Sequence, residues 1–155
     1  METNELSVRG LQKSDMYEIY RWRNDPFTIK YSETGRGVVL KEHKEWFEKL
    51  IQSNKDLIQI AEINGKPIGI ILFIRENESD SFDISINISP EYRKLGLGRR
   101  FLNLSEARLI EKVSKCIIRA KVLEENKNSS QFFIKSNYKF LQKINNILIY
   151  EKTLV

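Results

Sequence analysis

The chain has 155 residues, of which 41% are hydrophobic and 30% charged, and its formal net charge is +5. This length suits one domain with a buried core of its own, and the composition excludes an intrinsically disordered chain. We therefore expect a single domain over residues 1–155. The positive charge fits an anionic ligand, whereas the spread of the basic residues along the chain disfavours a nucleic-acid-binding domain.

Three further features limit the class of protein. No apolar run approaches the roughly 20 residues of a membrane-spanning helix, and the polar start at 1–5 is unlike a secretory signal peptide, so we expect no membrane association. The single cysteine, Cys116, cannot form an intrachain disulfide, which fits a reducing cytoplasm. With one cysteine and one histidine, His43, a Cys/His zinc site is excluded, and we expect no metal.

The N-terminal half is predicted to form a strand, a helix, a loop and a second helix, at 5–11, 13–24, 27–40 and 41–53. Ser14 or Asp15 is the expected cap of the first helix. Pro26 is expected to end that helix, because proline disfavours helical backbone in the residue before it.

The rest of the chain is predicted to alternate strands with helices. Asn64-Gly65 is a strong hairpin signal, and residues 82–88 alternate apolar with polar side chains, which indicates a half-buried strand. The predicted elements are strands at 57–63, 66–75 and 82–88, a helix at 97–113, a strand at 116–122, a helix at 127–136 and two strands within 138–154. The fold class is therefore α/β or α+β, with about seven strands and about four helices.

The segment 88–100, Ile-Ser-Pro-Glu-Tyr-Arg-Lys-Leu-Gly-Leu-Gly-Arg-Arg, joins a predicted strand to a predicted helix. Gly96 and Gly98 permit a turn that gathers backbone N–H groups, and the helix start adds unpaired donors and a positive dipole end. The segment therefore predicts a pyrophosphate site, although a plain strand-to-helix turn explains the glycine spacing equally well. It lacks the endings of a P-loop and of a dinucleotide-binding fingerprint.

The motif Arg93-x-x-Gly96-x-Gly98 resembles the acyl-CoA pyrophosphate motif of the GNAT superfamily of N-acetyltransferases. The order of the elements is similar to that fold, which implies a mixed, mostly antiparallel central sheet. Downstream, Asn126, Ser129 and the stretch 133–138 resemble the family's Asn-x-x-Ala/Ser-x-x-x-Tyr/Phe-x-Lys-x-Gly-Phe/Tyr pattern. The resemblance implies an acetyl-CoA-dependent N-acetyltransferase.

The resemblance also implies which residues hold acetyl-CoA. The amides of 95–99 would bind the pyrophosphate, and the backbone of 86–88 would pair with the pantetheine arm. Asn126 would hydrogen-bond the cofactor, cap the next helix, or do both, and Phe133 would lie near the thiol end. The implied cofactor residues are Ile86, Asn87, Ile88, Arg93, Lys94, Leu95, Gly96, Leu97, Gly98, Arg99, Asn126, Ser129 and Phe133.

Two N-terminal segments narrow the acceptor. Residues 20–26 (Tyr-Arg-Trp-Arg-Asn-Asp-Pro) and 40–47 (Leu-Lys-Glu-His-Lys-Glu-Trp-Phe) resemble signatures of a GNAT branch that acetylates UDP-linked 4-amino sugars on the way to pseudaminic and related nonulosonic acids. The resemblance implies a nucleotide-linked amino sugar as the acceptor and, because family members are often dimers, a homodimer. The implied acceptor-binding residues are Arg23, Asn24, Tyr31, His43, Trp46, Phe47 and Lys121. Trp22 and Trp46 as core aromatics, and His43 as a structural histidine, remain the plainer alternatives.

Acetyl transfer to an amine needs a base for the amine proton and uses an acid for the leaving thiolate. Where the branch carries a glutamate base and a tyrosine acid, this chain has Lys121 and Phe133. Asp83 is therefore the expected base, with Ser85 on the same strand face as a relay through water. The plainer alternative is that Asp83 is an exposed strand residue.

Other functions stay open at this point. A protein N-terminus, a polyamine or an aminoglycoside would keep the enzyme class, because acidic and basic residues are mixed in the N-terminal half. A CoA-binding protein without catalysis is supported by the residues at 121 and 133.

Overall fold

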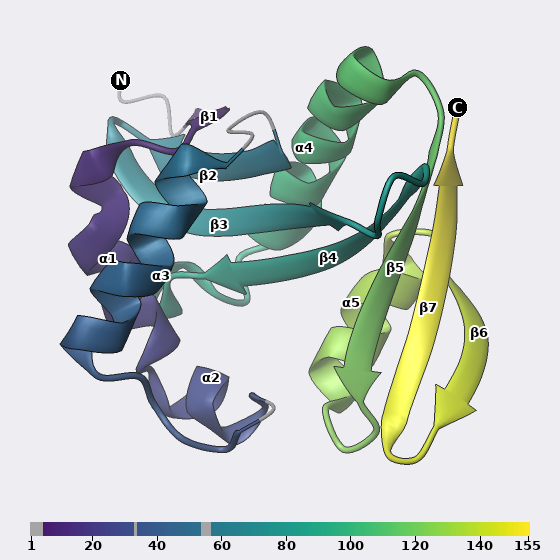
Figure 1. The fold of residues 1–155 in the computed structure, drawn as a ribbon. Helices are drawn as coiled ribbons and strands as arrows, with labels where there is room; N and C mark the ends of the chain where they lie inside the picture. Colours follow the sequence, from purple (N-terminus) through teal and green to yellow (C-terminus); the bar gives the residue numbers. More distant parts are fainter. Residues whose placement is uncertain (1–4, 33, 54–56) are drawn as a thin grey trace.

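The structure, a computed structural model, describes residues 5–32, 34–53 and 57–155. Within these residues the chain forms a seven-stranded sheet in the order β1-β2-β3-β4-β5-β7-β6 (Figure 1). The elements are β1 (Leu6–Gly10), α1 (Met16–Arg23), α2 (Pro26–Lys30), α3 (Leu40–Gln52), β2 (Ile58–Ile63), β3 (Lys66–Arg75), β4 (Ser81–Ile88), α4 (Leu97–Val113), β5 (Cys116–Leu123), α5 (Lys127–Lys135), β6 (Lys139–Ile144) and β7 (Ile147–Leu154). Short 3-10 turns precede α1 and follow β4.

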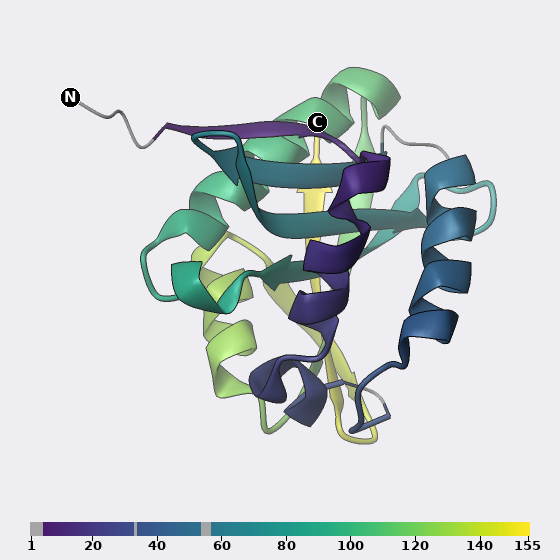
Figure 2. The same cartoon turned by 90° about the vertical axis from the view of Figure 1, so that its left-hand side faces the viewer.

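Helices cover both faces of the sheet, as Figures 1 and 2 show. Helices α1 and α3 lie on one face of β1–β4, over a small core of Leu11, Ile19, Trp22, Phe47, Ile58, Ile60 and Ile70. Helices α4 and α5 lie on the other face, over a larger core that includes Phe73, Phe82, Phe101, Leu109, Ile118 and Phe133. Strands β2 and β3 are buried on both sides, which explains the apolar run within β3. Across the described ranges, none of the helices combines the length and the apolar character needed to span a bilayer.

The structure confirms the predicted mixed, mostly antiparallel sheet, because every pair of neighbouring strands except β4 and β5 is antiparallel. The hairpin at Asn64-Gly65 is also confirmed, with positive φ values of 52° and 77°.

The loop predicted over 27–40 is wrong in its first part, because α2 occupies Pro26–Lys30. Asp25 caps α2 by accepting a hydrogen bond from the backbone N–H of Thr28, and Pro26 sits in the first turn, where its missing N–H costs nothing. The sequence predicts Pro26 only as the end of α1, whereas Pro26 also begins α2.

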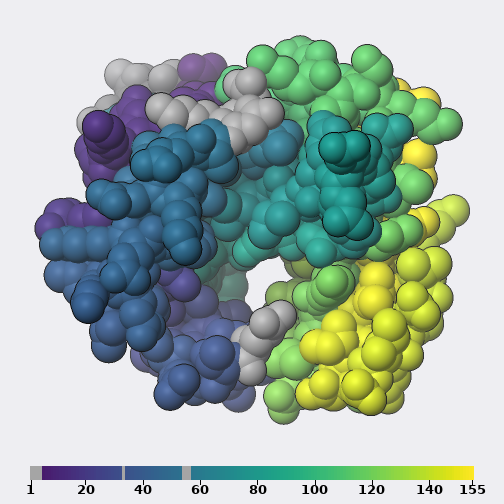
Figure 3. All heavy atoms as spheres, viewed as in Figure 1, coloured from purple at the N-terminus to yellow at the C-terminus, as the bar shows by residue number. Residues whose placement is uncertain are grey.

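The sheet opens between β4 and β5. These parallel strands pair only from Ser81 to Asp83 with Ile117 to Arg119, and beyond Asp83 they diverge (Figure 1). Figure 3 shows an opening through the molecule at this point, between the N-terminal segments (blue) and the C-terminal segments (green and yellow). We call this separation of β4 and β5 beyond Asp83 and Arg119 the fork. Within the described residues, it leaves the end of β4 paired on one edge only.

Candidate active site

The loop from β4 to α4 has the backbone of an anion-binding turn. Lys94 and Gly96 adopt positive φ values of 63° and 75°, and Gly96 is the residue before the first turn of α4. The first-turn N–H groups of a helix have no carbonyl partner within it. Gly98 allows that turn to approach α5, since a Cβ atom there would lie 3.0 Å from Cε2 of Phe132.

Positive charge surrounds this loop. Lys94, Arg99 and Arg100 are exposed, and none of them forms an ion pair with the described part of the chain. An open hollow of about 640 Å³ adjoins the loop, with Tyr92, Leu95 and Arg100 among its lining residues. The loop therefore offers unpaired donors and cations to a polyphosphate.

Helix α5 begins at the predicted asparagine. Asn126 caps it by accepting from the backbone N–H of Ser129, which confirms the capping alternative, and its side-chain amide donates to the Ser129 hydroxyl. Phe133 is buried and its ring lies 5.1 Å from that of Tyr138. The Tyr138 hydroxyl donates to Glu106 at 2.8 Å, and burial raises the pKa of this phenol above its ordinary value.

The fork between β4 and β5 carries the candidate base. The Lys121 Nζ atom lies 3.3 Å from Oδ2 of Asp83, and 29% of the Asp83 side chain is exposed. The second carboxylate oxygen, Oδ1, is buried without a hydrogen-bond partner among the described residues. Ser85 is exposed two residues further along β4, so the strand geometry places both side chains on one face. This face points toward α1, because Asn87 on the same face donates to the carbonyl of Trp22.

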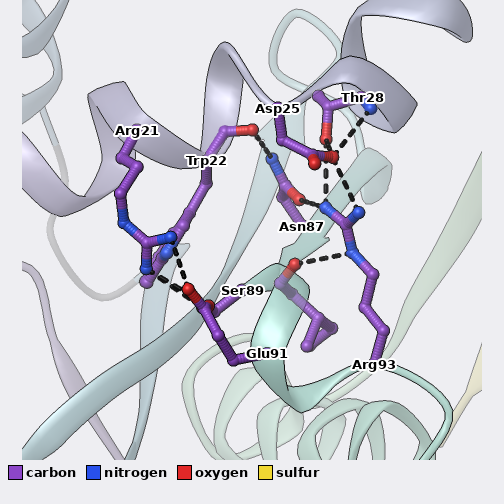
Figure 4. A network of polar contacts seen from close by, with 9 residues as sticks. Arg21, Trp22, Asp25, Thr28, Asn87, Ser89, Glu91 and Arg93 are labelled. Atoms are coloured by element: carbon purple, nitrogen blue, oxygen red, sulfur yellow. Dashed lines mark hydrogen bonds and ion pairs between the residues drawn. The ribbon is translucent and has the colours of Figure 1, made fainter.

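Arg93 lies at the centre of a polar network (Figure 4). Its Nη1 atom lies 2.7 Å from Oδ2 of Asp25, its Nη2 atom donates to the side chains of Thr28 and Asn87, and its Nε atom donates to the carbonyl of Ile88. Burial acts to raise the pKa of Asp25, but hydrogen bonds from Arg93 and Thr28 outweigh it and lower that pKa. Arg93 therefore faces α2 in this structure, and each of its three guanidinium nitrogens donates to the protein.

A second ion-pair group lies beside it. Arg21 of α1 binds Glu91 at 2.7 Å, and Ser89 donates its hydroxyl to the same carboxylate (Figure 4). The hydrogen bond from Ser89 and the neighbouring Arg21 lower the pKa of Glu91 to about 2. Sequence reasoning missed both groups, because their partners are about seventy residues apart.

Several predicted acceptor residues form a cluster between α1 and α3. His43 is fully buried; its Nε2–H donates to the carbonyl of Met16, and its Nδ1 accepts from Arg23. The Arg23 guanidinium lies 4.3 Å from the ring centre of Trp46, which is half-buried. Burial lowers the pKa of His43, so the imidazole is neutral and joins the two helices.

The other predicted acceptor residues lie in different surroundings. Asn24 holds the segment before α3, since its Oδ1 atom accepts from the backbone N–H of Val38. Tyr31 is half-buried against Phe27, and Phe47 is buried in the core under α3. Lys121 is therefore the predicted acceptor residue that the structure brings next to Asp83. Among the described residues, no group of three or more His, Cys, Asp or Glu side chains is arranged to hold a metal ion.

Solved structures of low sequence identity share this architecture. A domain from Methanocaldococcus jannaschii has a TM-score of 0.81 at 21% identity, covering 97% of this chain and 99% of that one. Spermidine N-acetyltransferase from Vibrio cholerae, solved with CoA and spermine, has a TM-score of 0.80 at 20% identity, covering 98% and 96%. PaiA N-acetyltransferase from Thermoplasma acidophilum, solved with coenzyme A, has a TM-score of 0.78 at 17% identity, covering 97% and 99%. At these identities the likeness shows the fold.

The sequence itself identifies the family. No curated protein is similar enough in sequence to count as a relative. Residues 16–138 match the family described as "Acetyltransferase (GNAT) family", and this match spans the anion-binding loop, the fork and helices α1 and α3. The chain therefore belongs to the GNAT acetyltransferase family and is an acetyl-CoA-dependent N-acetyltransferase.

Proposed function

We propose that the enzyme acetylates the primary amine of a nucleotide-linked amino sugar, and that Asp83 receives the proton of that amine. The observation that carries the proposal is the position of Asp83 at the fork, with one carboxylate oxygen on Lys121 and the other without a partner in the described chain. A partly exposed carboxylate at the point where two strands separate, with one buried oxygen that has no partner among the described residues, suits a group that accepts a proton from an amine in the fork.

The residues at the fork fit acetyl-CoA. Lys94, Arg99 and the first turn of α4 offer charge and donors to a pyrophosphate. Beyond Asp83 the edge of β4 lacks a β5 partner among the described residues, so its backbone groups are available to the amides of a pantetheine arm. When bound, acetyl-CoA supplies a thioester whose carbonyl carbon accepts the amine.

The amine must lose a proton before it can attack. Asp83 takes this proton directly or through a water held by Ser85, and Lys121 lies 3.3 Å from the carboxylate as its counter-charge. Phe133 has no proton to give, and Tyr138 donates its hydroxyl to Glu106. The thiolate of CoA is a fair leaving group, so positioning of the two reactants supplies much of the rate without an acid from the protein.

The charges at the fork and in the segment of α2 and the residues after it support an anionic acceptor. Asp83 is neutralised by Lys121 and Asp25 by Arg93. Lys30 at the end of α2 and Arg36 in the following segment form no ion pair within the described ranges. Unpaired cations and neutralised carboxylates suit a diphosphate better than a polycation.

A polyamine is the second candidate acceptor. Arg119, on the same face of β5 as Lys121, is shared by Glu76 at 3.3 Å and Glu151 at 3.0 Å, which leaves one net negative charge there. The likeness to the spermidine N-acetyltransferase structure adds to this candidate.

The deciding experiment is CoA thiol release with a panel of UDP- and dTDP-4-amino sugars, spermidine, spermine, aminoglycosides and peptides. Turnover restricted to an amino-sugar nucleotide supports the proposal, and turnover restricted to polyamines replaces it by the second candidate. Lys30→Gln and Arg36→Gln are matched probes: they raise the KM for a nucleotide sugar and leave the KM for spermidine unchanged or lower. The homodimer stays a prediction, which light scattering of the purified chain tests.

A further inference from the structure

Two sequence motifs that lie far apart in the chain meet in the structure. Arg93 begins the pyrophosphate motif, and Asp25 lies between α1 and α2 in segment 20–26, which carries one of the two N-terminal motifs. Their charged atoms are 2.7 Å apart, and the side chains are only 24% and 13% exposed. Figure 4 shows the Arg93 guanidinium pointing at the start of α2.

Arg93 forms hydrogen bonds both to the end of β4 and to the start of α2. From the loop after β4, its Nε atom donates to the carbonyl of Ile88 at the end of that strand, while its two other nitrogens reach Asp25, Thr28 and the side chain of Asn87. A guanidinium presents its donors in a fixed plane, so these contacts set the position of each partner relative to the others.

Helix α2 has little else to hold it. It is five residues long and contains no buried residue, and a helix this short is not stable by itself. Its N-cap, Asp25, is also the partner of Arg93, and the exposed ring of Phe27 lies 5.3 Å from the same guanidinium. The contacts to Arg93 therefore fix the start of α2 on the cofactor loop.

We propose that Arg93 is a positioning residue that locks α2 to the pyrophosphate loop, so that binding of CoA at the loop restrains α2 and sets the acceptor side of the fork. The acceptor part of this inference rests on the proposed function, in which Lys30 at the end of α2 favours the diphosphate of the acceptor. The coupling between the loop and α2 does not depend on the acceptor, and it can be measured without one.

The first test is hydrogen exchange of the α2 amides, followed by mass spectrometry with and without CoA. CoA slows this exchange in the wild-type chain, and Asp25→Asn removes the slowing. Asparagine caps a helix about as well as aspartate, so this substitution removes the carboxylate charge that pairs with Arg93 while α2 keeps its cap. Glu48→Gln, an exposed change on α3, is the matched control and keeps the wild-type response.

The second test compares acceptor KM with CoA affinity measured by calorimetry. Asp25→Asn and Arg93→Gln raise the acceptor KM about tenfold, because small displacements of positioning groups are costly, and they change the CoA affinity less than Arg99→Gln does. Arg93→Lys recovers the charge without the planar contacts and restores the KM only in part.

Two results overturn the inference: CoA leaves α2 exchange unchanged in the wild type, or Arg93→Gln weakens CoA binding as much as Arg99→Gln with no effect on exchange. If no acceptor of the panel is turned over, the proposed function fails while the exchange experiment still decides the coupling. Asp25→Asn and the wild type are compared by thermal unfolding first, so that a loss of folding is not counted as a loss of coupling.

Discussion

Lys121 of β5 reaches across the fork to Asp83 of β4, with 3.3 Å between Nζ and Oδ2. Lys121 lies two residues beyond Arg119, the last β5 residue that pairs with β4. In the catalytic proposal the carboxylate therefore comes from β4 and its counter-charge from β5. The pair places a carboxylate and its counter-charge where the two strands separate, and this is why the catalytic proposal centres on Asp83.

Asp83→Asn is expected to lower kcat by about 10²- to 10⁴-fold, which is the usual contribution of a general base. The substitution keeps the size of the side chain and removes its ability to take a proton. Ser85→Ala is the matched control on the same strand face, and its loss is smaller because water can replace a relay hydroxyl. Steady-state thiol release measures both, and a kcat of Asp83→Asn equal to that of the wild type excludes Asp83 as the base.

The glycines of the pyrophosphate loop predict a contrast in stability. Gly96→Ala forces a side chain onto a left-handed residue with φ of 75° and costs about 1–2 kcal/mol. Gly98→Ala displaces the half-buried ring of Phe132 but gains about 1 kcal/mol of helix propensity in α4. Thermal unfolding should therefore show a lower Tm for Gly96→Ala, by roughly 2–8 °C, and a Tm close to wild type for Gly98→Ala. Equal Tm losses would contradict this account of the loop.

Sequence patterns predicted most helices and strands, because the spacing of apolar residues along a segment determines which face of it is buried. The alternation of apolar and polar residues over 82–88 places Asp83, Ser85 and Asn87 on one face, and the structure has that face toward α1. Helix α2 escaped prediction because its five residues bury nothing and carry no periodic apolar pattern. Its signal was the pair Asp25-Pro26, a cap followed by a first-turn proline.

The candidate site was predictable only as far as motifs reach. The pyrophosphate loop and the cap at Asn126 follow from residues close in sequence. The partner of Arg93 does not, because an ion pair between positions 25 and 93 depends on the tertiary fold. The sequence of α3 also leaves the role of its aromatic residues open. The helical spacing of His43 and Phe47 suits a ligand site or a core, and the structure shows that both are buried.

The single thiol of the chain is not expected to react in the thiol-release assay that tests the enzyme's function. Cys116 is 1% exposed at the start of β5, and burial raises the pKa of its thiol, so little reactive thiolate forms. A thiol reagent should therefore detect no protein thiol in the native enzyme and the one cysteine of the chain after denaturation. A rapid native reaction would show that β5 opens, and would require correction of every thiol-release rate.

His43 predicts how stability depends on pH. Burial lowers its pKa in the folded protein, whereas the unfolded chain has the ordinary value of about 6.5. The unfolded state then binds the proton more readily, so the stability from neutral His43 is fully present above about pH 6.5 and is lost as the pH falls toward the folded-state pKa. Since the chain has one histidine, a comparison of wild type with His43→Gln between about pH 8 and pH 5 isolates this residue.

The same variant tests the structural role of the ring. His43 donates to the Met16 carbonyl and accepts from Arg23, and leaving such buried groups without partners costs about 1–3 kcal/mol. His43→Gln should therefore unfold at lower denaturant concentration at every pH, with a flatter pH dependence than the wild type above pH 5. A variant that keeps wild-type stability but loses acceptor affinity would instead assign His43 to the acceptor site. If the ring only joins α1 to α3, its replacement can change acceptor affinity only by destabilising the fold.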